Sequence, residues 1–211
     1  MRSVIFTLLL ALTLFATQSA QAQASQKSSA DIKQIDDALA VLEPKIGHYP
    51  PSIDSDLERK QIEGKYRNLV RTLDASIKKN PHDTELLLRR GKLHVMGHNM
   101  DVPEAWKKAE TDLKKVIRSQ PENEEALLAL GSLYVNTHPK YAPMAEKLFL
   151  KAQLVHGTAP LEDAHRGLMF AYYYQVKMDR ALAEAELLLK LSPANETYRT
   201  LRDIIATKVN K

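Results

Sequence analysis

Two histidines stand at a spacing that could support metal chemistry. His94 and His98 would lie one turn apart on a single helix face, and Asp101 follows three residues later. Two imidazoles and a carboxylate are ligands that Zn²⁺ accepts. The stretch from His94 to His98 lacks the glutamate that follows the first histidine in a zinc peptidase helix. A metal site would therefore rest on the spacing alone.

The chain carries no familiar catalytic motif. It contains no Gly-rich phosphate loop and no Gly-x-Ser-x-Gly elbow. It also has no cysteine, which excludes thiolate ligands, cysteine nucleophiles and disulfides. The pair Glu124 and Glu125 begins an expected helix, where negative charge is favourable without any catalytic role. We predict that the protein is not an enzyme, has no catalytic residues and needs no cofactor.

The N-terminal residues have the pattern of a secretory signal peptide. An Arg at position 2 precedes an apolar run from Val4 to Ala16, and small residues end at Ala22. The run is shorter than the roughly 20 residues that span a bilayer. We predict a cleaved signal over residues 1–22 and a flexible leader over residues 23–30, which would leave the mature protein without a membrane anchor. The alternative is that the signal segment is retained as an anchor. An exported chain without disulfides suits the periplasm, with secretion as the alternative.

The charge of the chain is close to balanced. The formal net charge is +4, and removal of the signal takes away only Arg2. This excess is too small on a chain of this size to indicate nucleic-acid binding.

Four prolines divide the rest of the chain into similar units. Pro81, Pro121, Pro160 and Pro193 are separated by 40, 39 and 33 residues, by subtraction. Each closes a pair of segments with helical periodicity. A period of about 20 to 50 residues is typical of a solenoid, in which each repeat stacks on the next.

The units resemble the tetratricopeptide repeat. Leu130, Gly131 and Tyr134 match the marker positions of its first helix, and Ala145 matches the small residue of its second. The resemblance implies an all-α, right-handed superhelical solenoid of helix-turn-helix repeats. We expect N-terminal helices over 31–80, repeats over 81–120, 121–159 and 160–193, and a capping helix over 194–211. The first N-terminal helix should end at Leu42, before Pro44. The capping helix should turn its apolar face inward: Tyr198, Leu201, Ile204 and Ile205.

Small residues in each unit should let its two helices approach closely. Gly91 and Gly131 lie on the first helices, and Ala109, Ala145 and Ala181 lie on the second helices. His94 takes the place that tyrosine occupies in the other two units. We therefore expect His94 to be a packing residue and predict no metal ion.

The resemblance also implies a concave groove lined by the first helix of each repeat. A protein or peptide segment with an acidic or apolar anchor would bind there. The alternative for Phe170 and Tyr173 is burial against the capping helix. The residues expected along the groove are Glu85, Lys92, Met96, Leu128, Ser132, Asn136, Arg166, Phe170, Tyr173 and Tyr174.

Two enlarged turns offer a second candidate surface. They cover residues 97–103 and 136–143, and both should lie on one edge of the stack. Insertions that recur on one face of a solenoid often mark its binding face. The alternative is that a longer turn is simply tolerated. The residues of this alternative edge are His98, Asp101, His138 and Tyr141.

Together these features predict a non-enzymatic, protein-binding scaffold in the bacterial cell envelope. A narrower resemblance is to the periplasmic repeat domain of cytochrome c maturation proteins. Two alternatives stay open: a self-associating structural adaptor that forms homo-oligomers, and an accessory factor of cell-wall enzymes.

Overall fold

The computed structural model describes residues 31–209, and these residues form helices joined by turns, with no strand among them. The all-helical prediction is confirmed. The predicted signal peptide and leader lie outside the described residues. The chain divides into two compact units, residues 1–41 and residues 42–211, and the second unit contains the repeats.

The first helix is longer than the sequence suggested. It covers residues 31–46 and passes through Pro44, so the expected end at Leu42 is wrong. Proline removes one helical N–H, but the amide of Gly47 still donates to the carbonyl of Glu43 at 2.8 Å. Ile46 is fully buried, with 0% of its surface exposed. Burial of this side chain offsets the missing hydrogen bond.

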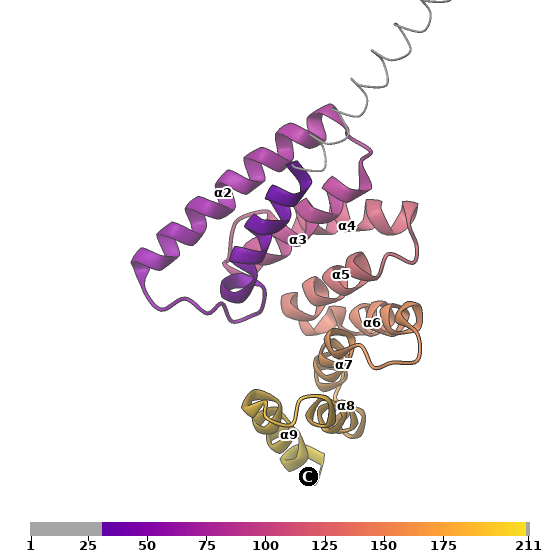
Figure 1. Cartoon of the computed structure of the whole chain (residues 1–211). Helices are drawn as coiled ribbons and strands as arrows, with labels where there is room; N and C mark the ends of the chain where they lie inside the picture. Colours follow the sequence, from indigo (N-terminus) through magenta and orange to yellow (C-terminus); the bar gives the residue numbers. More distant parts are fainter. Residues whose placement is uncertain (1–30, 210–211) are drawn as a thin grey trace, which may run out of the picture. The chain divides into compact units, whose positions relative to one another are not determined.

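The remaining helices pack in chain order (Figure 1). Each contacts the next, and α3 also contacts α5 while α5 contacts α7, so these three form an inner layer. The elements are α2 (Asp56–Lys79), α3 (Thr84–Asn99), α4 (Ala105–Ser119), α5 (Glu124–Thr137), the 3₁₀ helix η1 (Pro139–Tyr141), α6 (Ala142–His156), α7 (Glu162–Tyr174), α8 (Met178–Leu191) and α9 (Glu196–Val209).

Three of the four prolines occupy the same type of turn. Pro81, Pro121 and Pro193 each follow a residue whose amide closes the preceding helix and precede an Asp or Asn two positions later. The side chain of Asp83 accepts hydrogen bonds from the amides of Glu85 and Leu86, which caps α3. Proline cannot continue a helix, and the Asp or Asn caps the next one, so the turn reverses the chain within four residues.

Pro160 lies in a different connection. Gly157 ends α6 with φ of 101°, a backbone conformation that favours glycine. The side chain of Gln153 then holds the loop, because it donates to the carbonyls of Gly157 and Ala159 and accepts from the amide of Leu161.

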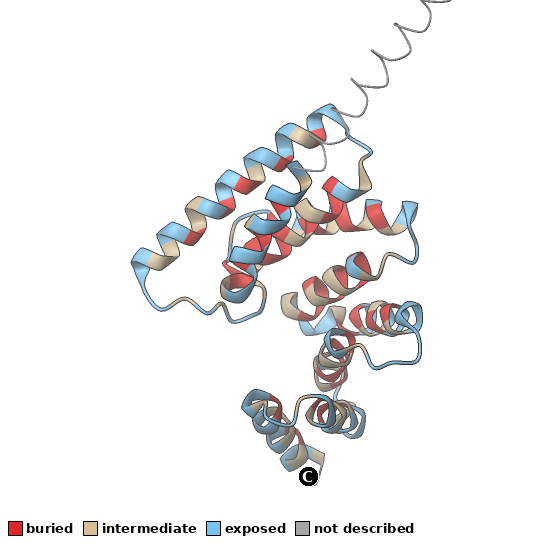
Figure 2. Ribbon diagram, viewed as in Figure 1, coloured by how far each residue is buried: buried red, intermediate tan, exposed pale blue. Residues whose placement is uncertain are grey.

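Buried residues alternate with exposed ones along the helices (Figure 2), and the small residues at the helix crossings are among the buried ones. Ala109, Ala145 and Ala181 are fully buried. A Cβ added at Gly91 would lie 2.8 Å from the side chain of Leu113, so the missing side chain is what allows α3 to approach α4. The predicted close crossings are present.

The third repeat achieves the same fit with the sizes exchanged. By repeat spacing, Met169 takes the place of Gly131, and Ala185 takes the place of Phe149. Both are fully buried. A large residue thus stands on the first helix and a small one on the second, the reverse of the arrangement in the second repeat.

The last helix buries a narrower face than expected. Tyr198 and Ile205 are buried, and the Tyr198 hydroxyl donates to Glu162 of α7 at 2.8 Å. Leu201 is half-buried, whereas Ile204 is 45% exposed. The predicted inward orientation of Ile204 is therefore wrong. A terminal helix packs on one side only, which leaves room for a single apolar stripe.

Candidate functional site

The inner helices bring part of the predicted groove together around one pocket. The pocket has a volume of about 330 Å³. Lys92 and Met96 reach it from α3, Leu128 and Ser132 from α5, and Arg166 from α7. Residues separated by more than 70 positions in sequence thus share one surface, because α3, α5 and α7 lie side by side in the inner layer.

The other predicted groove residues lie elsewhere. Asn136 is half-buried and its amide lies 3.5 Å from the side-chain oxygen of Asn99. The rings of Tyr173 and Tyr174 pack in a T-shaped arrangement. The ammonium of Lys208 on α9 lies 4.9 Å from the centroid of the Tyr173 ring. Tyr173 therefore contacts the capping helix, as its alternative assignment expected. Phe170 is half-buried and Tyr174 is 40% exposed, and neither lines the pocket.

A segment within the predicted N-terminal helices, which was not assigned to any site, forms one wall of the pocket. We call residues 42–48 the strap. Within it, Glu43, Gly47 and His48 line the pocket. The side-chain amide of Asn99 donates to the carbonyl of Ile46 at 3.0 Å, and Asn99 is only 1% exposed. His48 reaches Arg166 on α7, with Nε2 3.1 Å from the guanidinium. The strap thus crosses from α3 to α7.

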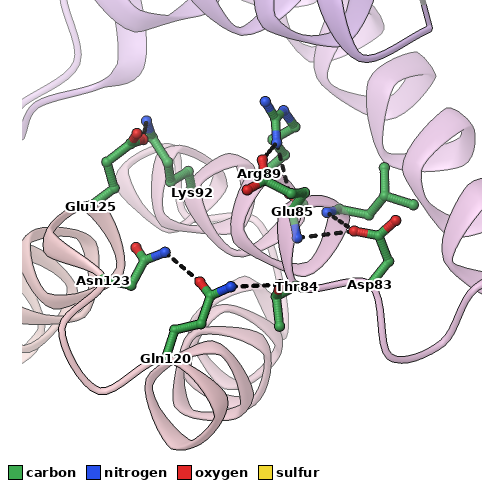
Figure 3. A network of polar contacts seen from close by, with 9 residues as sticks. Asp83, Thr84, Glu85, Arg89, Lys92, Gln120, Asn123 and Glu125 are labelled. Carbon is green, nitrogen blue, oxygen red and sulfur yellow. Dashed lines mark hydrogen bonds and ion pairs between the residues drawn. The ribbon is translucent and has the colours of Figure 1, made fainter. Parts of the chain in front are cut away.

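Ion pairs neutralise the two cations of the pocket. Lys92 contacts Glu125 at 2.7 Å (Figure 3). Arg166 contacts Asp163 at 2.7 Å, in addition to His48. Burial and the guanidinium of Arg166 lower the pKa of His48, so this imidazole is neutral at pH 7.

The pocket as a whole is acidic. Its lining holds two cations, Lys92 and Arg166, against the four carboxylates of Glu43, Glu124, Glu125 and Asp163, a formal charge of −2. One of these carboxylates, Glu124, is 2.9 Å from Nδ1 of His156. Because Arg166 is already paired, the lining does not favour the acidic anchor that the sequence suggested.

A polar network ties the first two repeats together beside the pocket (Figure 3). Gln120 donates to the hydroxyl of Thr84 at 3.0 Å and accepts from the side chain of Asn123 at 2.8 Å. Glu85, another predicted groove residue, pairs with Arg89 on its own helix at 2.7 Å. These contacts hold the starts of α3 and α5 in register.

The two enlarged turns lie next to each other, as predicted for the alternative edge. Nε2 of His98 is 3.2 Å from the hydroxyl of Thr137. Tyr141 stacks on Tyr134 at 5.5 Å between centroids, and its ring is 5.9 Å from that of Trp106. Tyr141 is therefore a packing residue that joins the second turn to the first repeat.

The remaining edge residues are exposed. Asp101 has φ of 62°, a left-handed conformation that Asp tolerates better than most residues. The side chain of His138 accepts from the amide of Lys140 at 3.1 Å and so caps η1.

His94 is buried at the interface of α2, α3 and α4. It is 3% exposed, and its Nδ1 lies 2.9 Å from the hydroxyl of Tyr66. Burial lowers its pKa to about 4. His94 and His98 therefore contact different partners. Within residues 31–209, no three His, Asp or Glu side chains gather as metal ligands would.

Comparisons with known proteins agree with this fold. No family model matches the chain, and no curated protein sequence matches it. Solved structures do. A tetratricopeptide repeat protein of Parabacteroides merdae superimposes with a TM-score of 0.58 at 20% identity, covering 73% of this chain and 56% of the other. The chain thus spans just over half the length of that protein.

Two further structures are similar. A thermophilic tetratricopeptide repeat protein of Thermus thermophilus, TTC0263, gives a TM-score of 0.54 at 18% identity over 72% of this chain and 78% of its own. MamA gives 0.53 at 20% identity over 74% of this chain and 91% of its own. The fold is therefore that of a tetratricopeptide-like helical solenoid. None of the described helices is both long enough and apolar enough to cross a bilayer.

Proposed function

We propose that this chain is an exported, non-enzymatic scaffold of the bacterial cell envelope that binds a segment of a partner protein in the pocket on its inner layer. The observation that carries the proposal is the convergence of Lys92, Ser132 and Arg166, from three successive repeats, on that pocket. Solenoids present such inner surfaces to partners.

The lining of the pocket points to the chemistry of the bound segment. Its floor is apolar, formed by side chains such as Val95, Met96 and Leu128. The surplus of carboxylates favours positive charge at the rim. A partner segment with an apolar side chain next to Lys or Arg fits both properties. The apolar side chain would supply most of the affinity and the cations would set its orientation.

The envelope location rests on the signal-like residues 1–22. The narrower role in cytochrome c maturation rests on the resemblance stated above. Fractionation of the producing cell tests the location: we expect a shortened chain in the periplasmic fraction. A full-length chain in the cytosol would contradict export.

Photo-crosslinking tests the binding site. A photoreactive phenylalanine analogue at Ser132 should crosslink a discrete partner band, whereas the same analogue at Lys151, exposed on α6, should not. Ala129→Phe fills the pocket and should remove the band from the Ser132 position, while circular dichroism shows the helices intact. Equal crosslinking from both positions, or a band that survives Ala129→Phe, would rule out the pocket as the binding site.

A further inference from the structure

A second hollow lies on a different surface, between α2 and the start of α4. Its volume is about 420 Å³. The apolar part of the lining comes from Tyr66, Val70, Val102, Pro103 and Ala105. Val102 and Pro103 belong to the enlarged turn of the first repeat. The insertion in that repeat thus supplies one wall of the hollow.

The charged part of the lining is entirely basic. Arg67, Arg71 and Lys108 surround the apolar floor, and the lining contains no carboxylate. Arg67 has a long contact of 3.4 Å with Glu63, and Arg71 donates to the amide oxygen of Asn68. The side-chain ammonium of Lys108 forms no hydrogen bond or ion pair with the residues that the structure describes. The hollow therefore presents positive charge that is little neutralised.

A buried imidazole also lines the hollow. His94 is 3% exposed, and the hydroxyl of Tyr66 lies within hydrogen-bond distance of its Nδ1, at 2.9 Å. No residue in the described part of the chain hydrogen-bonds to Nε2. This nitrogen can serve a ligand as well as the protein.

The hollow continues into a neighbouring one. A second cavity of about 540 Å³ shares His94 and Lys108 with the first, and its lining adds Lys107 and Lys115 of α4 together with the carboxylate of Glu104. Arg90 in that cavity is already held by Asp74 and Asp112. We call the surface of the two adjoining hollows the basic strip, because it carries a formal charge of +3. Six cations stand against three carboxylates: Arg67, Arg71, Arg90, Lys107, Lys108 and Lys115 against Asp74, Glu104 and Asp112. Two adjoining hollows suit an extended chain that contacts both of them better than a compact molecule.

We propose that the basic strip binds an acidic segment of a partner protein, with one apolar side chain inserted beside Val70 and Ala105 and its flanking carboxylates facing Lys108 and Arg71. Charge complementarity carries the choice of partner. The site is separate from the acidic pocket of the inner layer, which favours a basic segment. One chain would thus hold two segments of opposite charge.

Synthetic peptides test the proposal by calorimetry. The probe is an eight-residue peptide with a central phenylalanine between Asp and Glu residues. One comparison peptide replaces the phenylalanine by serine, and the other replaces the acids by lysines. We expect the first peptide to bind and the serine peptide to bind at least tenfold more weakly. The lysine peptide should not displace the first peptide from the strip. At equal peptide concentrations the imidazole NMR signals of His94 should shift most with the first peptide, less with the serine peptide and not with the lysine peptide.

Charge-reversal variants separate the strip from general attraction. Lys108→Glu should weaken the acidic peptide at least tenfold, whereas Lys151→Glu on α6 makes the same charge change away from the strip and should leave binding within twofold. Arg166→Glu in the inner pocket should also have no effect. The Arg166→Glu variant thus shows whether a loss of binding arises at the strip or at the pocket of the inner layer. No binding of the acidic peptide, or equal weakening by Lys108→Glu and Lys151→Glu, would overturn the proposal.

Discussion

The ring of Phe149 on α6 lies directly against Gly131 on α5. A Cβ added at Gly131 would be 2.8 Å from Cε1 of the ring, and Gly167 of α7 approaches the same ring from another helix. Phe149 is almost fully buried, so the ring cannot move aside. One aromatic side chain thus fills a space that two glycines leave open, and it joins the second repeat to the third.

Gly131→Ala should destabilise the protein. The added methyl overpacks the crossing, and the loss of about 1–3 kcal/mol exceeds the gain of up to about 1 kcal/mol in helix propensity. Urea denaturation measures the change. Gly64→Ala on α2 is the control, since a Cβ there has nothing within 4 Å. Gly64→Ala should raise the free energy of unfolding by about 0.5–1 kcal/mol. Stabilisation by both variants would contradict the close approach at Gly131.

Protonation of His94 should weaken the fold at acid pH. Its pKa falls from 6.5 to about 4 on burial, so the folded protein favours the neutral imidazole. The resulting stability is fully present above the unfolded pKa of 6.5 and is lost as the pH falls toward 4. Between pH 7 and pH 5, the loss from this group should be about 1–2 kcal/mol. His94→Gln cannot titrate, so its unfolding free energy should fall less over the same range. Equal pH dependence of the two proteins would be the contrary result.

Removal of Arg90 should leave a buried carboxylate without its partner. Arg90 donates to both oxygens of Asp112, at 2.7 and 2.9 Å, and to Asp74 at 2.8 Å. Asp112 is buried, whereas Asp74 is exposed. We expect Arg90→Ala to lower the free energy of unfolding by about 3 kcal/mol, because the charge of Asp112 is then unpaired.

A double-mutant cycle isolates that charge. The double variant with Asp112→Ala should be more stable than Arg90→Ala alone, since no buried charge is left behind. If the losses of unfolding free energy from the two single substitutions simply add in the double variant, the two side chains are not coupled.

Loss of the Asn99 amide should release the strap. Asn99 supplies the hydrogen bond to the carbonyl of Ile46, and an unpaired buried carbonyl costs about 1–3 kcal/mol. With Asn99→Leu, the amides of residues 42–48 should exchange with deuterium faster, while those of α8 keep their rates. Gly47 and Ser52 are the most direct reporters, because their amides are hydrogen-bonded within and beside the strap. Unchanged exchange at both positions would show that Asn99 does not hold the segment.

The sequence by itself determined the helical repeats. The prolines at 81, 121 and 193 stop each repeat, and the small residues at 109, 145 and 181 allow its helices to cross. These are local effects of backbone geometry and side-chain size, so spacing along the chain is enough to reveal them. The same reasoning named Lys92, Ser132 and Arg166, because register within a repeat decides which helix face is inward.

Only the tertiary structure decided what lies over that inner face. The strap, the pairing of Arg166 with His48, and the contact of Tyr173 with Lys208 join residues that no repeat period connects. The strap depended on a helix that continues through Pro44 because Ile46 is buried, a gain that local propensity does not contain. Long-range packing thus set the shape and the charge of the pocket, whereas local patterning set the scaffold that carries it.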